Sequence, residues 1–144
     1  MPPAQDVDRD FTNAPAEKLL AAQERQDPRS IWCYSGIEEV KNNMASTNYP
    51  DHLVRYVQGQ VENTLAHSLP DQVALLRLDT DWYESTKHEL IHLFPRLSKN
   101  GVVIIDDYGH WKGSQKAVDE FFSENKINIL LNRVNYSVRM GLKL

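Results

Sequence analysis

The apolar residues of this chain are concentrated in its second half. The dense apolar runs all lie after Val73, and two of them, VALLRL at 73–78 and VVII at 102–105, are followed at once by aspartate. Short apolar runs of this kind are typical of buried strands, and helical patterns separate them here. Strands that alternate with helices predict an α/β fold, with a parallel sheet covered by helices on both faces.

The same pattern predicts the order of the elements. Helices are expected over 15–26, 35–45, 84–97 and 115–125, with a helical turn over 62–67. Strands are expected over 53–57, 73–78, 102–105, 127–132 and 137–142, with a turn at Asn100–Gly101. Residues 1–14 combine acids and prolines with little apolar surface, which predicts an extended lead-in. The 144 residues therefore form one domain or part of one, with its clearest core over 73–144.

Composition and charge exclude several classes of protein. A net charge of −4 gives no reason to expect a nucleic-acid partner, because phosphate-binding surfaces need clustered Lys and Arg. The N-terminal residues lack the basic and apolar regions of a signal peptide, and the apolar runs are too short to cross a bilayer. The single Cys33 fits a reducing compartment. We expect a cytoplasmic protein without a membrane partner.

Acidic residues follow two of the predicted strands directly. Asp79 comes after 73–78, and Asp106 and Asp107 come after 102–105. Ligands of open α/β sheets bind beyond the carboxyl ends of the strands, so neighbouring strands would bring these carboxylates together. A hard divalent cation such as Mg²⁺ prefers oxygen ligands and would relieve their repulsion. Alternatively, the acids cap helices or form ion pairs with basic residues, for which the candidates are Arg77, Lys112 and Lys116.

The sequence around these acids resembles the macrocin O-methyltransferase family. The long match is LLRLDTDWYESTKHELIHLFPRLSKNGVVIIDDYGHWKGSQKAVDEFF at 75–122. Shorter similar segments are MPPAQDVD near the start, NNMASTNYP at 42–50, YVQGQVENTL at 56–65 and LLNRVNYSVRMGLK at 130–143. The resemblance implies a Rossmann-like sheet and an enzyme that uses S-adenosylmethionine (SAM) and Mg²⁺ to methylate a hydroxyl of a small molecule, such as a sugar.

Carried over by position, the resemblance assigns the site residues. Asp79, Asp106 and Asp107 match the metal ligands. Gly59 and Gln60 lie in a loop that resembles the one near the adenine of the cofactor. His110 and Asp81 are the candidates for the base that accepts the hydroxyl proton, since both lie beyond the strand ends. His110 is equally well an ordinary loop histidine, and Asp81 equally well caps the next helix.

A glycine-rich cofactor turn is not found in this sequence. In the family that turn precedes the segment resembling MPP, and none of the six glycines here forms such a cluster. We therefore expect an N-terminally truncated methyltransferase domain in which 73–78 is an unpaired apolar edge strand. A homodimer would cover that edge. The alternative to an enzyme is a catalytically inactive, truncated methyltransferase-like domain, or an accessory protein.

Two other enzyme classes share short motifs with this chain. His88-Glu89-Leu90-Ile91-His92 matches the HExxH pattern of zinc proteases, but its helical phase directs both histidines away from the apolar face and toward water. Asp79-Thr80-Asp81 with the later Asp106-Asp107 resembles the haloacid dehalogenase phosphatases, whose usual Thr or Val is replaced here by Tyr83. Four aromatic residues flank the acids, and they either stack on an acceptor or pack in the core: Trp82, Tyr83, Tyr108 and Trp111.

Overall fold

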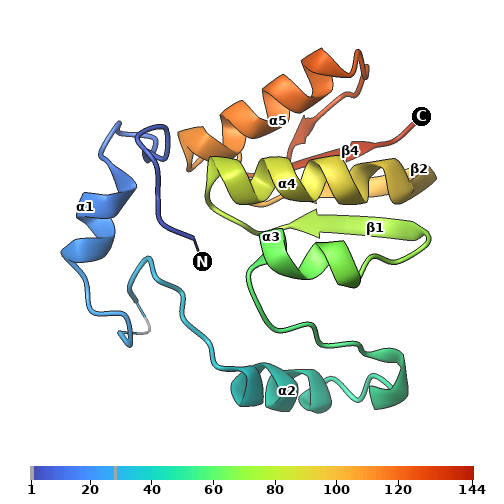
Figure 1. Ribbon diagram of the computed structural model, residues 1–144, viewed down its shortest axis with the longest axis horizontal. Coiled ribbons are helices and arrows are strands. Elements are labelled where there is room, and N and C mark those ends of the chain that lie inside the picture. The colour runs from blue at the N-terminus through green and yellow to red at the C-terminus, as the bar shows by residue number, and fades with distance from the viewer. Residues whose placement is uncertain (1, 28) are drawn as a thin grey trace.

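The computed structural model describes residues 2–27 and 29–144, which are built around a four-stranded sheet with the order β1-β2-β4-β3 (Figure 1). Strand β1 (Val73–Leu78) runs parallel to β2 (Leu97–Ile105), whereas β4 (Arg139–Leu142) is antiparallel to both β2 and β3 (Asn132–Arg133). The sheet is therefore mixed, and the prediction of a parallel sheet holds only for β1 and β2.

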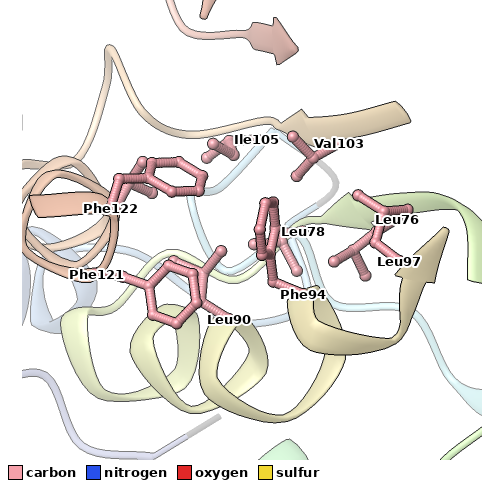
Figure 2. Close-up of a cluster of buried hydrophobic side chains, with 10 residues drawn as sticks. Leu76, Leu78, Leu90, Phe94, Leu97, Val103, Ile105, Phe121 and Phe122 are labelled. Atoms are coloured by element: carbon pink, nitrogen blue, oxygen red, sulfur yellow. The ribbon is translucent and has the colours of Figure 1, made fainter. Parts of the chain in front are cut away.

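Two helices cover one face of this sheet and close the hydrophobic core. They are α4 (Tyr83–Leu93) and α5 (Lys112–Glu124), which pack against each other (Figure 1). Alternate residues of β1 and β2 point toward the helices, as the period of a strand requires. The buried cluster that results consists of Leu76, Leu78, Leu90, Phe94, Leu97, Val103, Ile105, Val118, Phe121 and Phe122 (Figure 2).

The opposite face of the sheet is exposed. Leu75, Val102 and Leu142 are in register across three strands, and Leu75 and Leu142 are 58% and 54% exposed. Met140, in register with Ile104, is 40% exposed. The α/β class is confirmed, but helices on this second face are not found among the described residues. Strand β1 likewise has no partner on its outer side in the part of the chain that the structure covers.

The N-terminal lead-in is held against the ends of both helices. The Asp8 carboxylate is 1% exposed and accepts the backbone N–H groups of Gln5 (2.7 Å) and Tyr83 (2.8 Å). Isolated bridges also join Arg9 to Pro15 and Asp10 to Trp111. A carboxylate that accepts an N–H of the first turn is a common way to satisfy a helix N-terminus. The lead-in is thus irregular, as predicted, yet fixed in place.

Helix α1 (Ala16–Ala21) follows this lead-in and ends earlier than predicted. Ala16 packs with Trp82 and Trp111 in a second small core, but residues 21–26 are exposed. Without an apolar surface to bury, the rest of the predicted helix lacks the packing that stabilises short helices.

The connection from α1 to β1 is largely exposed. It contains α2 (Ile37–Ser46), the 3₁₀ turns η1 (Asp51–Leu53) and η2 (Leu65–His67), and the short α3 (Val61–Thr64). The prediction of a strand over 53–57 is wrong. Leu53 and Val57 are 60% and 45% exposed, and no neighbouring strand offers them hydrogen bonds. No helix in the described residues has the length and apolar character needed to cross a membrane.

The bounds predicted for the elements near β2 and β4 also differ from the observed ones. Helix α4 ends at Leu93 and passes through a 3₁₀ turn, η3 (Phe94–Arg96), into β2, which begins at Leu97 instead of Val102. Asn100, with φ of +62°, lies in an irregular part of β2 and not in a separate turn. The strand predicted over 137–142 is confirmed as the shorter β4, whereas the one predicted over 127–132 is wrong except at its last residue, because β3 begins only at Asn132. Between β3 and β4, the Asn135 side chain accepts the N–H groups of Ser137 and Val138.

Candidate active site

The carboxyl ends of β1 and β2 bring the predicted acids together. Leu78 and Ile105 are paired residues, and the Asp106 N–H donates to the Leu78 carbonyl at 3.0 Å. The residues that follow the two strands therefore emerge at the same edge of the sheet. A cavity of about 450 Å³ lies there, lined by Asp79, Asp81, Asp106, Asp107, His110, Ile31, Trp32, Cys33, Trp111 and Tyr136.

Arg77 partly neutralises this group of acids. Its guanidinium donates to Asp79 at 2.8 Å and also to Asp106, so it links the ends of the two strands. Arg77 and Asp79 are about half exposed, and exposed pairs contribute little to stability. Lys112 donates a hydrogen bond to Asn13, and Lys116 lies near Glu120. Of the three basic residues that the sequence offered as ion-pair partners, only Arg77 therefore pairs with the strand-end acids.

Burial and the remaining negative charge raise the pKa values of the carboxyls. Burial, followed by the hydrogen bond and charge of Asp106, raises the pKa of Asp79 to about 6. Burial and the charge of Asp107 raise the pKa of Asp81 to about 7. Burial and the charge of Asp106 also raise the pKa of Asp107. Carboxyls that hold protons this strongly are close together and short of positive charge.

The carboxylate oxygens in this cavity are suitable ligands for a hard divalent cation. The acids supply only oxygen ligands, which Mg²⁺ prefers, and a cation would relieve the repulsion that raises their pKa values. In the described residues, no three His, Cys, Asp or Glu side chains are grouped closely enough to hold an ion as they stand. Arg77 contacts one oxygen each of Asp79 and Asp106, so an ion that binds these two oxygens would compete with the guanidinium.

His110 lies on the wall of the cavity among aromatic rings. Its Nδ1 is 3.1 Å from the Tyr136 hydroxyl, and the rings of Phe11, Trp111 and Tyr136 surround it at 4.8–6.0 Å between centroids. The hydrogen bond to Tyr136 fixes one ring nitrogen and leaves Nε2 for another partner. His110 and Asp81 therefore line the same cavity, and the geometry leaves both as candidates for the base.

The cofactor candidates Gly59 and Gln60 line a second, smaller cavity. It measures about 210 Å³, and Asp79 lies on its wall as well as on that of the acidic cavity. Gly59 has a φ of +148°, and a Cβ there would meet Thr64 Cγ2 at 2.6 Å, so only glycine fits without strain. Thr80, Glu62 and Ser85 complete the side nearest the protein core.

The four aromatic residues that flank the acids in the sequence divide between the core and the cavity, which the sequence had left open. Trp82 is buried and meets Trp111 edge to face at 4.9 Å, while Tyr83 and Tyr108 bond to acidic residues of α5. Of the four, only Trp111 reaches the cavity, where Trp32 and Tyr136 join it. Sequence reasoning missed these two because they come from loops distant in the chain.

The HExxH motif does not have the geometry of a zinc protease. Glu89 is buried and accepts the Thr80 hydroxyl at 2.7 Å, beneath the end of β1. The histidine rings contact each other at 4.3 Å between centroids. His88 and His92 are half-buried, so the expectation that both are solvated is wrong.

Known proteins share this arrangement of elements. A sequence profile of the family described as Macrocin-O-methyltransferase (TylF) matches residues 8–140. The chain belongs to this family. Membership in the macrocin O-methyltransferase family favours the methyltransferase interpretation over the phosphatase and zinc-protease alternatives, and the comparisons do not favour an accessory protein.

Relatives in the family cover this chain to different extents. Demethyldecarbamoylnovobiocin O-methyltransferase of Streptomyces niveus is 40% identical over 84 residues, which are 58% of this chain and 32% of that protein. The 8-demethyl-8-(2,3-dimethoxy-alpha-L-rhamnosyl)-tetracenomycin-C 4'-O-methyltransferase of Streptomyces olivaceus is 43% identical over 72 residues, 50% of this chain and 28% of that protein. The solved O-methyltransferase NovP superposes with a TM-score of 0.75 at 29% identity, covering 97% of this chain and 55% of NovP.

Proposed function

We propose that this chain carries the acceptor side of a Mg²⁺-dependent O-methyltransferase, which moves a methyl group from SAM to a hydroxyl of a natural-product sugar. Membership in the macrocin O-methyltransferase family supports methyl transfer. The two relatives from Streptomyces niveus and Streptomyces olivaceus are named as O-methyltransferases of complex natural products, one of which carries a rhamnosyl group. The matches span only 32% and 28% of those proteins, so the complete activity is part of the proposal.

The observation that carries the proposal is the position of Asp79 between the two cavities. Asp79 lines the 450 Å³ acidic cavity and also the 210 Å³ cavity beside Gly59 and Gln60. An acceptor hydroxyl among the acids would therefore lie next to a methyl donor held beside the glycine loop. In-line placement of the two reactants is the main requirement of methyl transfer.

The residues of this chain have separate tasks in that arrangement. Asp79, Asp106 and Asp107 would hold the cation, and Gly59 and Gln60 would border the adenine end of the cofactor. When bound, SAM supplies an electrophilic methyl group and Mg²⁺ favours the ionised form of a hydroxyl that it contacts. His110 or Asp81 would accept the proton of the acceptor hydroxyl, while the methyl group that SAM supplies would end on the acceptor oxygen and leave the cofactor as its thioether. Trp32, Trp111 and Tyr136 would exclude water from the cavity.

Titration of the purified chain with SAM, in Mg²⁺ and in EDTA, tests this function. We expect SAM to bind, and methyl transfer to a panel of glycosides to require Mg²⁺. His110→Gln and Asp81→Asn should separate the two candidate bases, because only the variant that removes the base loses turnover while it keeps SAM. Absence of SAM binding would show that this chain does not act alone as a methyltransferase.

A further inference from the structure

Helix α4 carries two histidines that are not explained by the methyltransferase site. His88 and His92 lie one helical turn apart, and their rings are 4.3 Å apart between centroids with an interplanar angle of 52°. Residues spaced by four share one face of a helix, and this face is half-buried beside α3. Figure 1 shows α3 alongside α4, on the side away from α5.

Two polar atoms at this contact lack partners. His88 Nε2 and Glu62 Oε2 are buried and make no hydrogen bond among the residues that the structure describes. The other oxygen of Glu62 accepts the Ser85 hydroxyl at 2.5 Å, so its carboxylate is already held in place on α3. Buried polar atoms are normally satisfied, so each of these two atoms has the capacity to bind a water or an ion.

We propose that His88 and His92 chelate one divalent transition-metal ion, with one nitrogen from each imidazole as ligand and Glu62 as the neighbouring negative charge. The two rings lie close enough for one nitrogen of each to turn toward a shared ion, since zinc–nitrogen bonds are about 2.0–2.1 Å long. Imidazole favours Cu²⁺, Ni²⁺ and Zn²⁺ over Mg²⁺, so the pair differs in metal preference from the carboxylates beyond the strands.

Other features of the contact are consistent with this assignment. Burial and the nearby His92 lower the pKa of His88, which leaves its imidazole neutral and ready to bind at neutral pH. Water completes the coordination, since no third residue among those described is close enough to act as a ligand as it stands. Glu89 faces Thr80, so the pair has no general base and is a binding site without protease chemistry.

The bound ion would also restrain the cofactor loop. Helix α3 begins directly after Gln60, and the carboxylate of Glu62 on α3 is close enough to His88 for its negative charge to favour the protonated imidazole. Attraction between the ion and Glu62 would hold α3 on α4 and limit movement of the loop that contains Gly59. Transition-metal binding at this contact would therefore reduce hydrogen exchange of the amides over 59–64.

Titration with Ni²⁺ in excess Mg²⁺, which occupies the carboxylates, tests the proposal. We expect one equivalent of Ni²⁺ to bind, the binding to disappear in His92→Gln, and His52→Gln, an exposed histidine on η1, to bind as the wild type does. Glu62→Gln should weaken binding about tenfold, as loss of a group next to the ligands commonly does. Equal Ni²⁺ binding by the wild type and by His92→Gln would overturn the assignment, as would a wild type that binds none.

A spectroscopic measurement avoids dependence on a folded variant. Electron paramagnetic resonance of the wild-type chain with one equivalent of Cu²⁺ should show nitrogen couplings from two imidazoles. A spectrum with couplings from one imidazole, or with oxygen ligands only, would equally overturn the chelate. Neither measurement involves SAM or methyl transfer, and the Cu²⁺ spectrum is recorded without Mg²⁺, so failure of this proposal can be told apart from failure of the proposed function.

Discussion

The guanidinium of Arg77 on β1 donates to the carboxylate of Asp106 at the end of β2, so an ion pair joins the two strands where their acidic motifs begin. The same guanidinium holds Asp79 at 2.8 Å. Arg77 thus supplies positive charge to carboxyls that a cation would otherwise bind. Its position makes the arginine and a metal ion competitors for the same oxygens.

Arg77→Gln should therefore strengthen Mg²⁺ binding. Each exposed ion pair is worth roughly 0.2–1 kcal/mol, so release of Asp79 and Asp106 should raise the affinity a few-fold. Isothermal titration of the two proteins with Mg²⁺ measures the difference, with Arg55→Gln as a control at an exposed arginine elsewhere. Weaker Mg²⁺ binding by Arg77→Gln would show instead that the arginine positions the carboxylates for the ion.

Glu89→Gln should change how stability depends on pH. Burial raises the pKa of Glu89 to about 7 from an ordinary 4.5. A raised acid pKa means that stability is fully present below about pH 4.5 and falls as pH rises through 7. Over that pH range, the free energy of unfolding of the wild type should fall by up to about 3 kcal/mol relative to that of Glu89→Gln. Urea unfolding at pH 5 and pH 8 measures this, and an equal difference at both pH values would contradict it.

Asp8→Ala should loosen the N-terminal lead-in. The substitution leaves the N–H groups of Gln5 and Tyr83 without their acceptor, at a cost of about 2 kcal/mol in the free energy of unfolding. The backbone amides of residues 5–16 should also exchange hydrogen faster in Asp8→Ala than in the wild type. Asp6→Ala removes an exposed acid two residues away and should leave both quantities near those of the wild type. A matching effect of the two substitutions would exclude a special role for Asp8.

The exposed face of the sheet should drive self-association. Leu75 and Leu142 are in register with Val102 on this face, and β1 has a free edge in the described part of the chain. Exposed apolar patches and unpaired edges favour association, so the apparent mass should rise with concentration in light scattering. Leu75→Lys should reduce this effect, whereas Ile91→Lys, on α4, should not. A monomer at all concentrations would show that the face is not adhesive.

The sequence predicted the elements whose pattern is local and strong. Strand β1, strand β2 and the acids beyond them were evident because apolar runs end abruptly in aspartate. Helix α5 was also predicted well, since its buried residues follow the helical period. These features depend on neighbours in the chain, so a single sequence is sufficient to find them.

Other parts of the site depend on contacts distant in the chain. The loop of Trp32 and Cys33 reaches the cavity through the packing of α1, and Cys33 adopts a φ of +41° that nothing in its sequence requires. Tyr136 arrives there because Asn135 closes the turn between β3 and β4. The false strand over 53–57 has the residues of a strand but no partner strand. Local pattern alone cannot supply that partner.

We propose that the acids beyond β1 and β2 form a divalent-cation site. The most direct test is isothermal titration of the chain with Mg²⁺, compared with the double variant Asp106→Asn, Asp107→Asn. Asp119→Asn, at an exposed acid of α5, serves as the control for the loss of a carboxylate charge elsewhere. We expect one Mg²⁺ per chain in the wild type and in Asp119→Asn, and none in the double variant. Unchanged Mg²⁺ binding by the double variant would contradict it.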